Sequence, residues 1–192
     1  MRIALIQGHP DPGGGHFCHA IADAYRGGAL AVGHEVRVVE IASTPFPLLR
    51  AKEEYEHGVA PPSLAPAQQA IAWADHLVIV YPLWLGGMPA LLKGFLEQVL
   101  RPGFAYETRP GKGWTRKLRG RSARVIVTMG MPAFFYRWYF GAHGLKALRR
   151  SILSFVGIAP VRSTLIGLVE SGSDAQRQRW LARIEALGEA AR

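Results

Sequence analysis

The chain has 192 residues, of which 49% are hydrophobic, 10% aromatic and 19% charged. This composition supplies enough apolar surface for a core and excludes global disorder, and the length favours a single domain over residues 1–192. The formal charge of +9 is compatible with nucleic acid, an anionic membrane surface or a phosphorylated small molecule as partner, and charge alone does not choose among them.

Cysteine content and hydropathy limit the cellular compartments in which the protein is expected. No apolar run reaches the roughly 20 residues that a membrane-spanning helix needs, and the longest, residues 77–85, has the size of a buried strand. The apolar N-terminal run is too short for a secretory signal. The single cysteine, Cys18, excludes an internal disulfide and a cysteine-pair zinc site. We therefore expect a cytoplasmic protein.

The first part of the chain predicts a strand, a helix and a second strand. Residues 2–8 are largely aliphatic and end at glycine, and a glycine-rich loop follows. The next segment is amphipathic, and its end is marked by Gly27, Gly28 and Gly33. Residues 34–41 then alternate as a strand does. Together they predict a right-handed βαβ unit.

The middle of the chain combines a long excursion with a buried strand. Residues 45–66 hold five of the thirteen prolines, which predicts a surface segment with at most a short helix, of the kind that often acts as a lid. Residues 66–74 predict a helix with proline in its first turn. The apolar run 75–82 is typical of a central strand, and residues 88–100 predict a core-facing helix.

The last part of the chain continues the alternation. Residues 124–129 and 161–169 predict strands, and residues 143–155 and 173–190 predict helices, the last with Ser173 as N-cap. Five strands alternating with helices predict an α/β fold, a doubly wound parallel sheet with helices on both faces. A ligand is then expected beyond the carboxyl ends of the strands.

Positive charge is densest in residues 109–124, which contain seven basic residues and no acidic one. Three interpretations stay open: a solvated loop and strand edge, attraction of a nucleotide phosphate, or nucleic-acid binding. No zinc-finger, basic-zipper or RNA-recognition motif accompanies the stretch. We therefore expect no nucleic-acid partner.

The loop after the first strand predicts a phosphate site, because its glycines allow close approach and its amides stand at a helix N-terminus. It matches neither of the two commonest nucleotide fingerprints. His16, Cys18 and His19 lie close in sequence, with His9 nearby, but successive helical residues do not share a face, so we expect no metal site. Cys18 is expected to be a small buried apolar residue.

The loops after the third and fourth strands are rich in aromatic residues. Trp84 stands beside Gly86 and Gly87, and it predicts either a flat surface for a stacked ring or a plug for the end of the sheet. Residues 134–140 carry six aromatics, which predict a pocket wall, a dimer contact or simple packing. Tyr136 and His143 bring a phenol and an imidazole that could hydrogen-bond a substrate oxygen and exchange protons.

Several of these segments resemble the flavodoxin-like NAD(P)H:quinone oxidoreductase family, which includes quinone reductases, modulator-of-drug-activity proteins and ancillary subunits of potassium efflux. The matching blocks are His-Pro-Asp-Pro at 9–12, Phe-Cys-His-Ala at 17–20, Ala-Asp-His-Leu-Val at 74–78, Pro-Leu-Trp at 82–84, Met-Pro-Ala-Leu-Leu-Lys-Gly at 88–94 and Gly-Phe-Ala-Tyr at 103–106. The resemblance implies a flavodoxin-like fold with five parallel strands in the order 2-1-3-4-5.

The resemblance also implies a flavin cofactor, FMN or FAD, and the residues that hold it. The implied cofactor-binding residues are His9, Gly15, His16, Phe17, Cys18, Pro82, Leu83, Trp84, Leu85, Thr128, Met129 and Gly130. Tyr136 follows Thr128 at the spacing of the family's substrate-pocket tyrosine, and His143 resembles the family's histidine before glycine after a one-residue shift. His16 replaces the usual serine, and Met129 replaces a threonine, so the phosphate and the flavin edge are held differently.

The mechanism that the resemblance implies is ping-pong. NAD(P)H passes a hydride to flavin N5, and a quinone or similar acceptor takes it from the same place, at a site on a homodimer interface. One alternative is a flavin-binding regulatory subunit that docks peripherally on a membrane transporter of the potassium-efflux type. A one-electron flavodoxin carrier is disfavoured because such carriers tend to be acidic.

Overall fold

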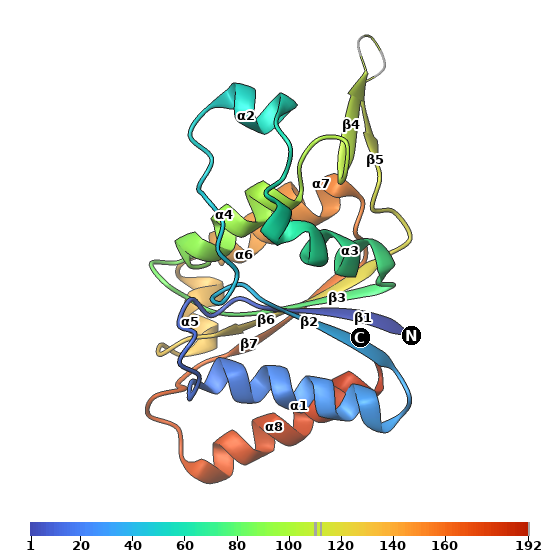
Figure 1. Cartoon of the computed structure of the whole chain (residues 1–192). Coiled ribbons are helices and arrows are strands. Elements are labelled where there is room, and N and C mark those ends of the chain that lie inside the picture. The colour runs from blue at the N-terminus through green and yellow to red at the C-terminus, as the bar shows by residue number, and fades with distance from the viewer. Residues whose placement is uncertain (110, 112, 192) are drawn as a thin grey trace.

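The structure is a computed structural model that describes residues 1–109, 111 and 113–191. Five parallel strands form its main sheet, in the order β2-β1-β3-β6-β7 (Figure 1). These strands are β1 (Arg2–Gln7), β2 (Glu35–Glu40), β3 (His76–Pro82), β6 (Ser122–Thr128) and β7 (Val161–Ile166). The α/β fold is confirmed. The order in chain numbering is 2-1-3-6-7 rather than 2-1-3-4-5, because two further strands, β4 (Tyr106–Arg109) and β5 (Gly113–Arg116), form a separate antiparallel sheet.

Helices cover both faces of the main sheet. Helices α1 and α8 lie on one face, and α3, α4 and the helical run from α6 to α7 lie on the other (Figure 1). The helical elements are α1 (Phe17–Ala31), α2 (Lys52–His57), η1 (Pro62–Leu64), α3 (Ala65–Trp73), α4 (Ala90–Val99), α5 (Ala133–Trp138), α6 (His143–Lys146), the π-helical η2 (Ala147–Leu153), α7 (Ser154–Val156) and α8 (Asp174–Glu189). In the described part of the chain, no helix is long and apolar enough to span a bilayer.

Alternation along the strands divides the core into two layers. Ile3 and Leu5 of β1 pack on the side of α1 and α8, whereas Ala4 and Ile6 pack on the opposite side. All four side chains are completely buried. Strands that are apolar on both faces in this way occupy the centre of a parallel sheet, which leaves their carboxyl ends as the accessible places for a site.

The first helix does not end at Gly27 and Gly28 as the sequence predicted, because α1 continues to Ala31. Gly28 lies against α8: a Cβ at this position would stand 2.1 Å from the carbonyl oxygen of Glu185. The glycine therefore permits close helix packing instead of ending the helix. Gly33, which has φ of +80°, follows the helix end, where a left-handed residue is common.

Later segments refine two further predictions. Residues 134–140, expected as a loop, contain most of the short helix α5, with Pro132 in the N-cap position. Ser173 caps α8 as predicted: its hydroxyl accepts a hydrogen bond from the Gln176 amide, and the Gln176 side chain accepts one from the Ser173 amide.

The basic stretch lies at the amino end of β6, away from the carboxyl ends of the strands. Arg121 uses its guanidinium there to bind the carbonyl oxygens of Ile71 and Ala72, at 3.2 and 2.6 Å, where α3 ends. Strand β5 is exposed along its whole length. This placement favours the interpretation as a solvated loop and strand edge. Lys112 and the side chain of Arg109 lie outside the described residues.

Candidate functional site

A groove of about 920 Å³ opens at the carboxyl ends of β1, β3 and β6. The predicted cofactor-binding residues that line it are His9, Gly15, His16, Phe17, Cys18, Pro82, Trp84 and Thr128. They come from the segments after three different strands, where ligands of doubly wound sheets bind. The sequence therefore predicted the position of the groove.

Gln7, the last residue of β1, organises the loop that forms one wall. Its side chain is buried, with 4% exposed. The Gln7 amide nitrogen donates to the Cys18 carbonyl at 3.1 Å, and its oxygen accepts from the His9 amide at 3.1 Å. One buried amide thus ties the loop to the first turn of α1. Sequence reasoning missed this residue, because it reads as part of the strand.

Three imidazoles gather at the start of α1, whereas the sequence predicted that Cys18 and His19 would not converge with His16. The His9 and His16 rings stack at 3.9 Å, and His19 lies 5.2 Å from His9 and 5.7 Å from His16. His16 and His19 are three residues apart and so share a helix face, while the loop returns His9 to them. Within the described residues no group of side chains is arranged to hold a metal ion.

Hydrogen bonds and burial shift the pKa values of Asp11 and His9. The Asp11 carboxylate bonds His16 Nε2 at 2.7 Å and accepts the Gly13 amide at 2.8 Å, which lowers the Asp11 pKa. The Asp11 amide donates to His9 Nδ1 at 3.1 Å, so the proton of neutral His9 lies on Nε2. Burial, and then the charges of His16 and His19, lower the His9 pKa. His9 is therefore a neutral donor beside an ionised carboxylate.

Backbone amides complete this end of the groove. Gly14 and Gly15 adopt φ values of +70° and +75°, and no atom lies within 4 Å of where a Cβ would stand on either. The first amides of an α-helix have no intrahelical acceptor, and no side chain caps α1. An anion placed here meets open glycine backbone and the positive end of a 15-residue helix.

Trp84 lines the groove from a tight turn, with its ring edge-on to that of His9 at 6.2 Å between centres. The Trp84 and Gly87 backbones exchange two hydrogen bonds of 3.0 Å, and the turn between them places Leu85 and Gly86 at φ of +46° and +77°. Half of the Trp84 side chain is exposed, 51%. The indole therefore borders the groove as an accessible flat surface and does not plug the end of the sheet.

Beneath the groove, the Cys18 thiol and the Thr128 hydroxyl lie 3.0 Å apart. Cys18 is buried, as predicted, with 2% exposed. Burial raises the pKa of its thiol to about 11, so the thiol stays protonated at neutral pH. This pair joins α1 to the end of β6 and forms part of the floor.

The other predicted residues do not line the groove. Met129 is buried in the core, while Leu85 is fully exposed on the turn. Leu83 uses its amide to bind the Thr128 carbonyl at 2.7 Å. Gly130 lies near Glu170: a Cβ on Gly130 would stand 3.5 Å from a carboxylate oxygen.

Tyr136 and His143 lie behind the Trp84 turn. Tyr136 is buried, and its hydroxyl donates to the Gly86 carbonyl and accepts from the Leu145 amide, both at 3.2 Å. It therefore does not stand on an open rim. His143 is exposed at the start of α6. Its neighbour Gly144 touches the turn, where a Cβ would stand 2.3 Å from the Gly86 oxygen.

Residues after β7 complete the groove and were missed. Val169, Glu170 and Arg177 line it, and the Arg177 guanidinium bonds Asp174 at 2.9 Å and the Val169 carbonyl at 3.3 Å. The rule that located the other loops also applies to the end of the fifth predicted strand. Applied there, it would have found this segment.

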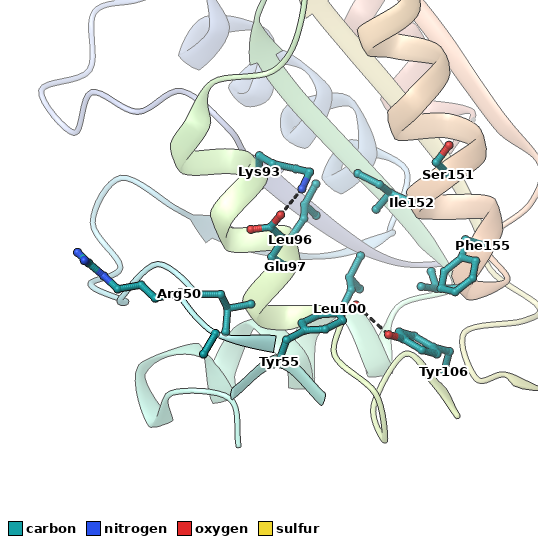
Figure 2. A pocket seen from close by; sticks show the side chains of 13 residues that line it. Arg50, Tyr55, Lys93, Leu96, Glu97, Leu100, Tyr106, Ser151, Ile152 and Phe155 are labelled. Atoms are coloured by element: carbon teal, nitrogen blue, oxygen red, sulfur yellow. Dashed lines mark hydrogen bonds and ion pairs between the residues drawn. The ribbon is translucent and has the colours of Figure 1, made fainter. Parts of the chain in front are cut away.

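A second cavity, of about 410 Å³, lies between α4, η2 and the proline-rich excursion (Figure 2). The Tyr55 and Tyr106 hydroxyls meet at 2.8 Å on one side, and Lys93 bonds Glu97 on the other. The excursion 45–66 thus walls a cavity, but none of the predicted site residues lines it.

The groove fits a flat, phosphorylated cofactor. It is lined by a half-exposed indole, by open glycine backbone and helix amides, and by the His9 imidazole, whose ring centre lies 6.2 Å from that of Trp84. In doubly wound sheets of this strand order, as in flavodoxin, the flavin nucleotide binds at the carboxyl ends of the strands where their order reverses. The chain matches the Flavodoxin-like fold family over residues 1–187, and it belongs to that family.

Individual relatives agree with this assignment. The chain is 28% identical over 185 residues to an uncharacterized NAD(P)H oxidoreductase of Haemophilus influenzae, covering 94% of this chain and 91% of that protein. It is 30% identical over 146 residues to NAD(P)H dehydrogenase [quinone] 1 of Rattus norvegicus, covering 70% of this chain but only 52% of the rat protein. The crystal structure of Smu.1420 from Streptococcus mutans UA159 superposes with a TM-score of 0.84 at 28% identity, covering 99% of this chain and 100% of that one.

Proposed function

We propose that the protein is a flavin-dependent NAD(P)H oxidoreductase that transfers two electrons to a quinone or similar acceptor. The observation that carries this proposal is the groove that joins the Trp84 indole to the glycine loop at the start of α1. The oxidoreductase names of the relatives support it. They favour catalysis over the alternative of a regulatory subunit on a transporter.

A bound flavin supplies two-electron redox chemistry between a reduced nicotinamide and the acceptor. The chain's own residues hold and orient it. The Gly14 and Gly15 backbone, the amides of the first turn of α1 and the Nε2 proton of His9 would bind its phosphate, while Asp11 fixes the His9 tautomer. Trp84 and Pro82 would hold the ring, and Thr128 at the floor would lie beneath it.

The two candidate catalytic residues take different parts in this proposal. His143 is exposed beside the Trp84 turn and is the group that hydrogen-bonds a substrate oxygen. Tyr136 is a positioning residue, because its hydroxyl is engaged by Gly86 and Leu145. It fixes the position of the turn that carries Trp84 relative to α6.

The proposal extends to assembly and location. Leu85 on the turn is fully exposed, and Tyr139 and Phe140, which follow Tyr136 closely in sequence, are 73% and 46% exposed. We infer that this apolar surface is covered by a second copy in a homodimer. The single free cysteine is compatible with the reducing cytoplasm.

Flavin titration tests the proposal most directly. Purified protein is expected to quench the fluorescence of added FMN or FAD at a 1:1 endpoint, and the loaded protein should oxidise NADH or NADPH faster when a quinone is added. A chain that binds neither flavin would overturn the proposal. Flavin binding without quinone-dependent oxidation of NADH or NADPH would indicate a flavoprotein with another activity.

A further inference from the structure

The outer edge of the main sheet carries a hollow that the proposed function does not use. It encloses about 960 Å³ over β7, between α8 on one face and α5, α6 and η2 on the other. Figure 1 shows β7 at the border of the sheet between these two helical layers. Among the described strands β7 pairs only with β6, and Ser163, Thr164 and Leu165 in its middle are only partly buried. The floor of this hollow is therefore an open strand edge.

Positive charge converges on the hollow from five elements. Its cationic lining residues are Arg124 of β6, Arg137 of α5, Lys146 of α6, Arg149 of η2 and Arg183 of α8. No carboxylate is among the described residues that line it. Within the described part of the chain, Arg137, Lys146, Arg149 and Arg183 form no ion pair. Convergence of unpaired cations from separate elements favours an anionic ligand.

Aromatic rings stand among these cations. Trp138 and Phe134 line the hollow with 80% and 67% of their side chains exposed. On the α8 side, the Arg183 guanidinium lies over the Trp180 ring, 5.2 Å from its centre. Exposed rings beside arginines stack planar heterocycles, and arginine also pairs with phosphate. The lining therefore suits a ligand that carries both a flat ring and a phosphate chain.

We propose that this hollow binds a nucleotide, with its base against the Trp138 face and its phosphates on Arg137, Lys146 and Arg183. A second copy of this chain does not suit the hollow itself, because the lining carries several cations and no carboxylate among its described residues, and two such linings would face each other. An acidic peptide would satisfy the charges but offers no flat ring to Trp138. A bilayer surface cannot follow a hollow between two layers of helices.

Calorimetric titration with ADP, on protein saturated with FMN, tests this proposal. The double variant Arg137→Gln/Arg183→Gln is expected to weaken ADP binding about tenfold or more, since it removes two charge-assisted phosphate contacts. The matched control is Arg150→Gln/Arg179→Gln, which removes the same charge from exposed positions outside the hollow. The control should change affinity less than about twofold.

A second arm separates the base from the phosphates. Trp138→Leu is expected to weaken ADP about fivefold while leaving pyrophosphate binding unchanged, because only ADP has a ring to stack. Absence of ADP binding, equal weakening in both double variants, or no effect of Trp138→Leu would overturn the proposal. Tighter binding of a single-stranded oligonucleotide or of phosphatidylserine vesicles through the same arginines would also overturn it, by identifying a macromolecular anion.

The titration is informative whether or not the flavin proposal holds. If the chain binds no flavin, the same titrations are done on the protein alone, and the double variants still compare the hollow with the rest of the surface. Both double variants are expected to keep the flavin affinity of the unchanged protein, because Arg137, Arg150, Arg179 and Arg183 do not line the flavin groove.

Discussion

Trp84 is the residue on which the flavin groove depends most. Replacing it with alanine removes the flat wall, and we expect the dissociation constant for flavin to rise about tenfold, the equivalent of roughly 1.4 kcal/mol. Quenching of flavin fluorescence measures the change. Trp114→Ala is the matched control, because Trp114 is similarly exposed, 47% against 51%, and packs on Phe155 away from the groove. Equal losses in both variants would contradict the assignment.

His76 makes stability depend on pH. The side chain is buried at the start of β3, its Nδ1 lies 2.7 Å from the Ser122 hydroxyl, and its Nε2 has no partner in the described part of the chain. Burial, followed by the charges of Arg124 and Arg162, lowers its pKa to about 4. The unfolded chain, with an ordinary histidine pKa of 6.5, thus binds more protons than the folded chain between these values.

The stabilisation is therefore complete above about pH 6.5 and is lost as the pH falls toward about 4. We expect the free energy of unfolding to drop over this window by on the order of 3 kcal/mol from His76. Urea denaturation at a series of pH values measures the slope. His76→Gln should flatten it, whereas His57→Gln, a change on exposed α2, should not.

For single residues, the sequence predicted which loops form the groove better than it predicted the hydrogen-bond partners of individual side chains. The loops that carry His9, Trp84 and Thr128 were located correctly, since the ends of parallel strands converge by topology. The hydrogen bonds of Tyr136 were not predictable, because they join positions 50 and 9 residues away. Local pattern carries no information about such partners.

Among the elements, the contact of α1 with α8 depends on glycine. A Cβ on Gly28 would meet the Glu185 carbonyl, whereas Gly27 faces open space. Gly28→Ala must separate the helices, and we expect it to lower the free energy of unfolding by about 1 to 3 kcal/mol. Gly27→Ala, in the same helix, should raise it by roughly 0.5 to 1 kcal/mol, since alanine is the better helix former. Urea unfolding of the two variants checks this difference.

The same substitution connects packing to function. The first turn of α1 borders the groove through Phe17 and Cys18, so a displaced α1 should also weaken flavin binding in Gly28→Ala but not in Gly27→Ala. If Gly28→Ala is as stable as the unchanged protein, the close approach is not a constraint. The sequence placed the end of α1 at Gly27 and Gly28 because a glycine pair after an amphipathic stretch usually marks a helix end.

Elements with strong periodicity were predictable, and those set by distant contacts were not. The strand at 75–82 and the helix at 173–190 are present with small shifts of their ends. The hairpin of β4 and β5 was missed because its four-residue strands are short and polar, and pairing rather than hydropathy defines them.

For the whole molecule, the homodimer proposal makes one measurable claim. Leu85→Asp places a charge on the exposed turn and is expected to shift the protein toward monomer in sedimentation velocity, because a buried unpaired carboxylate is costly. Val59→Asp is the control, since Val59 is 90% exposed on the excursion rather than on the turn. A protein that is monomeric without any substitution would refute the dimer, and a Leu85→Asp variant that stays dimeric would place the interface elsewhere.

The Tyr136 hydroxyl, wedged between Gly86 and Leu145, couples two stretches of chain that are remote in sequence. A ligand that immobilises the turn carrying Trp84 is therefore expected to immobilise helix α5 as well. Arg137 is exposed on that helix, and we expect added flavin to slow trypsin cleavage after it, as measured by mass spectrometry of the fragments.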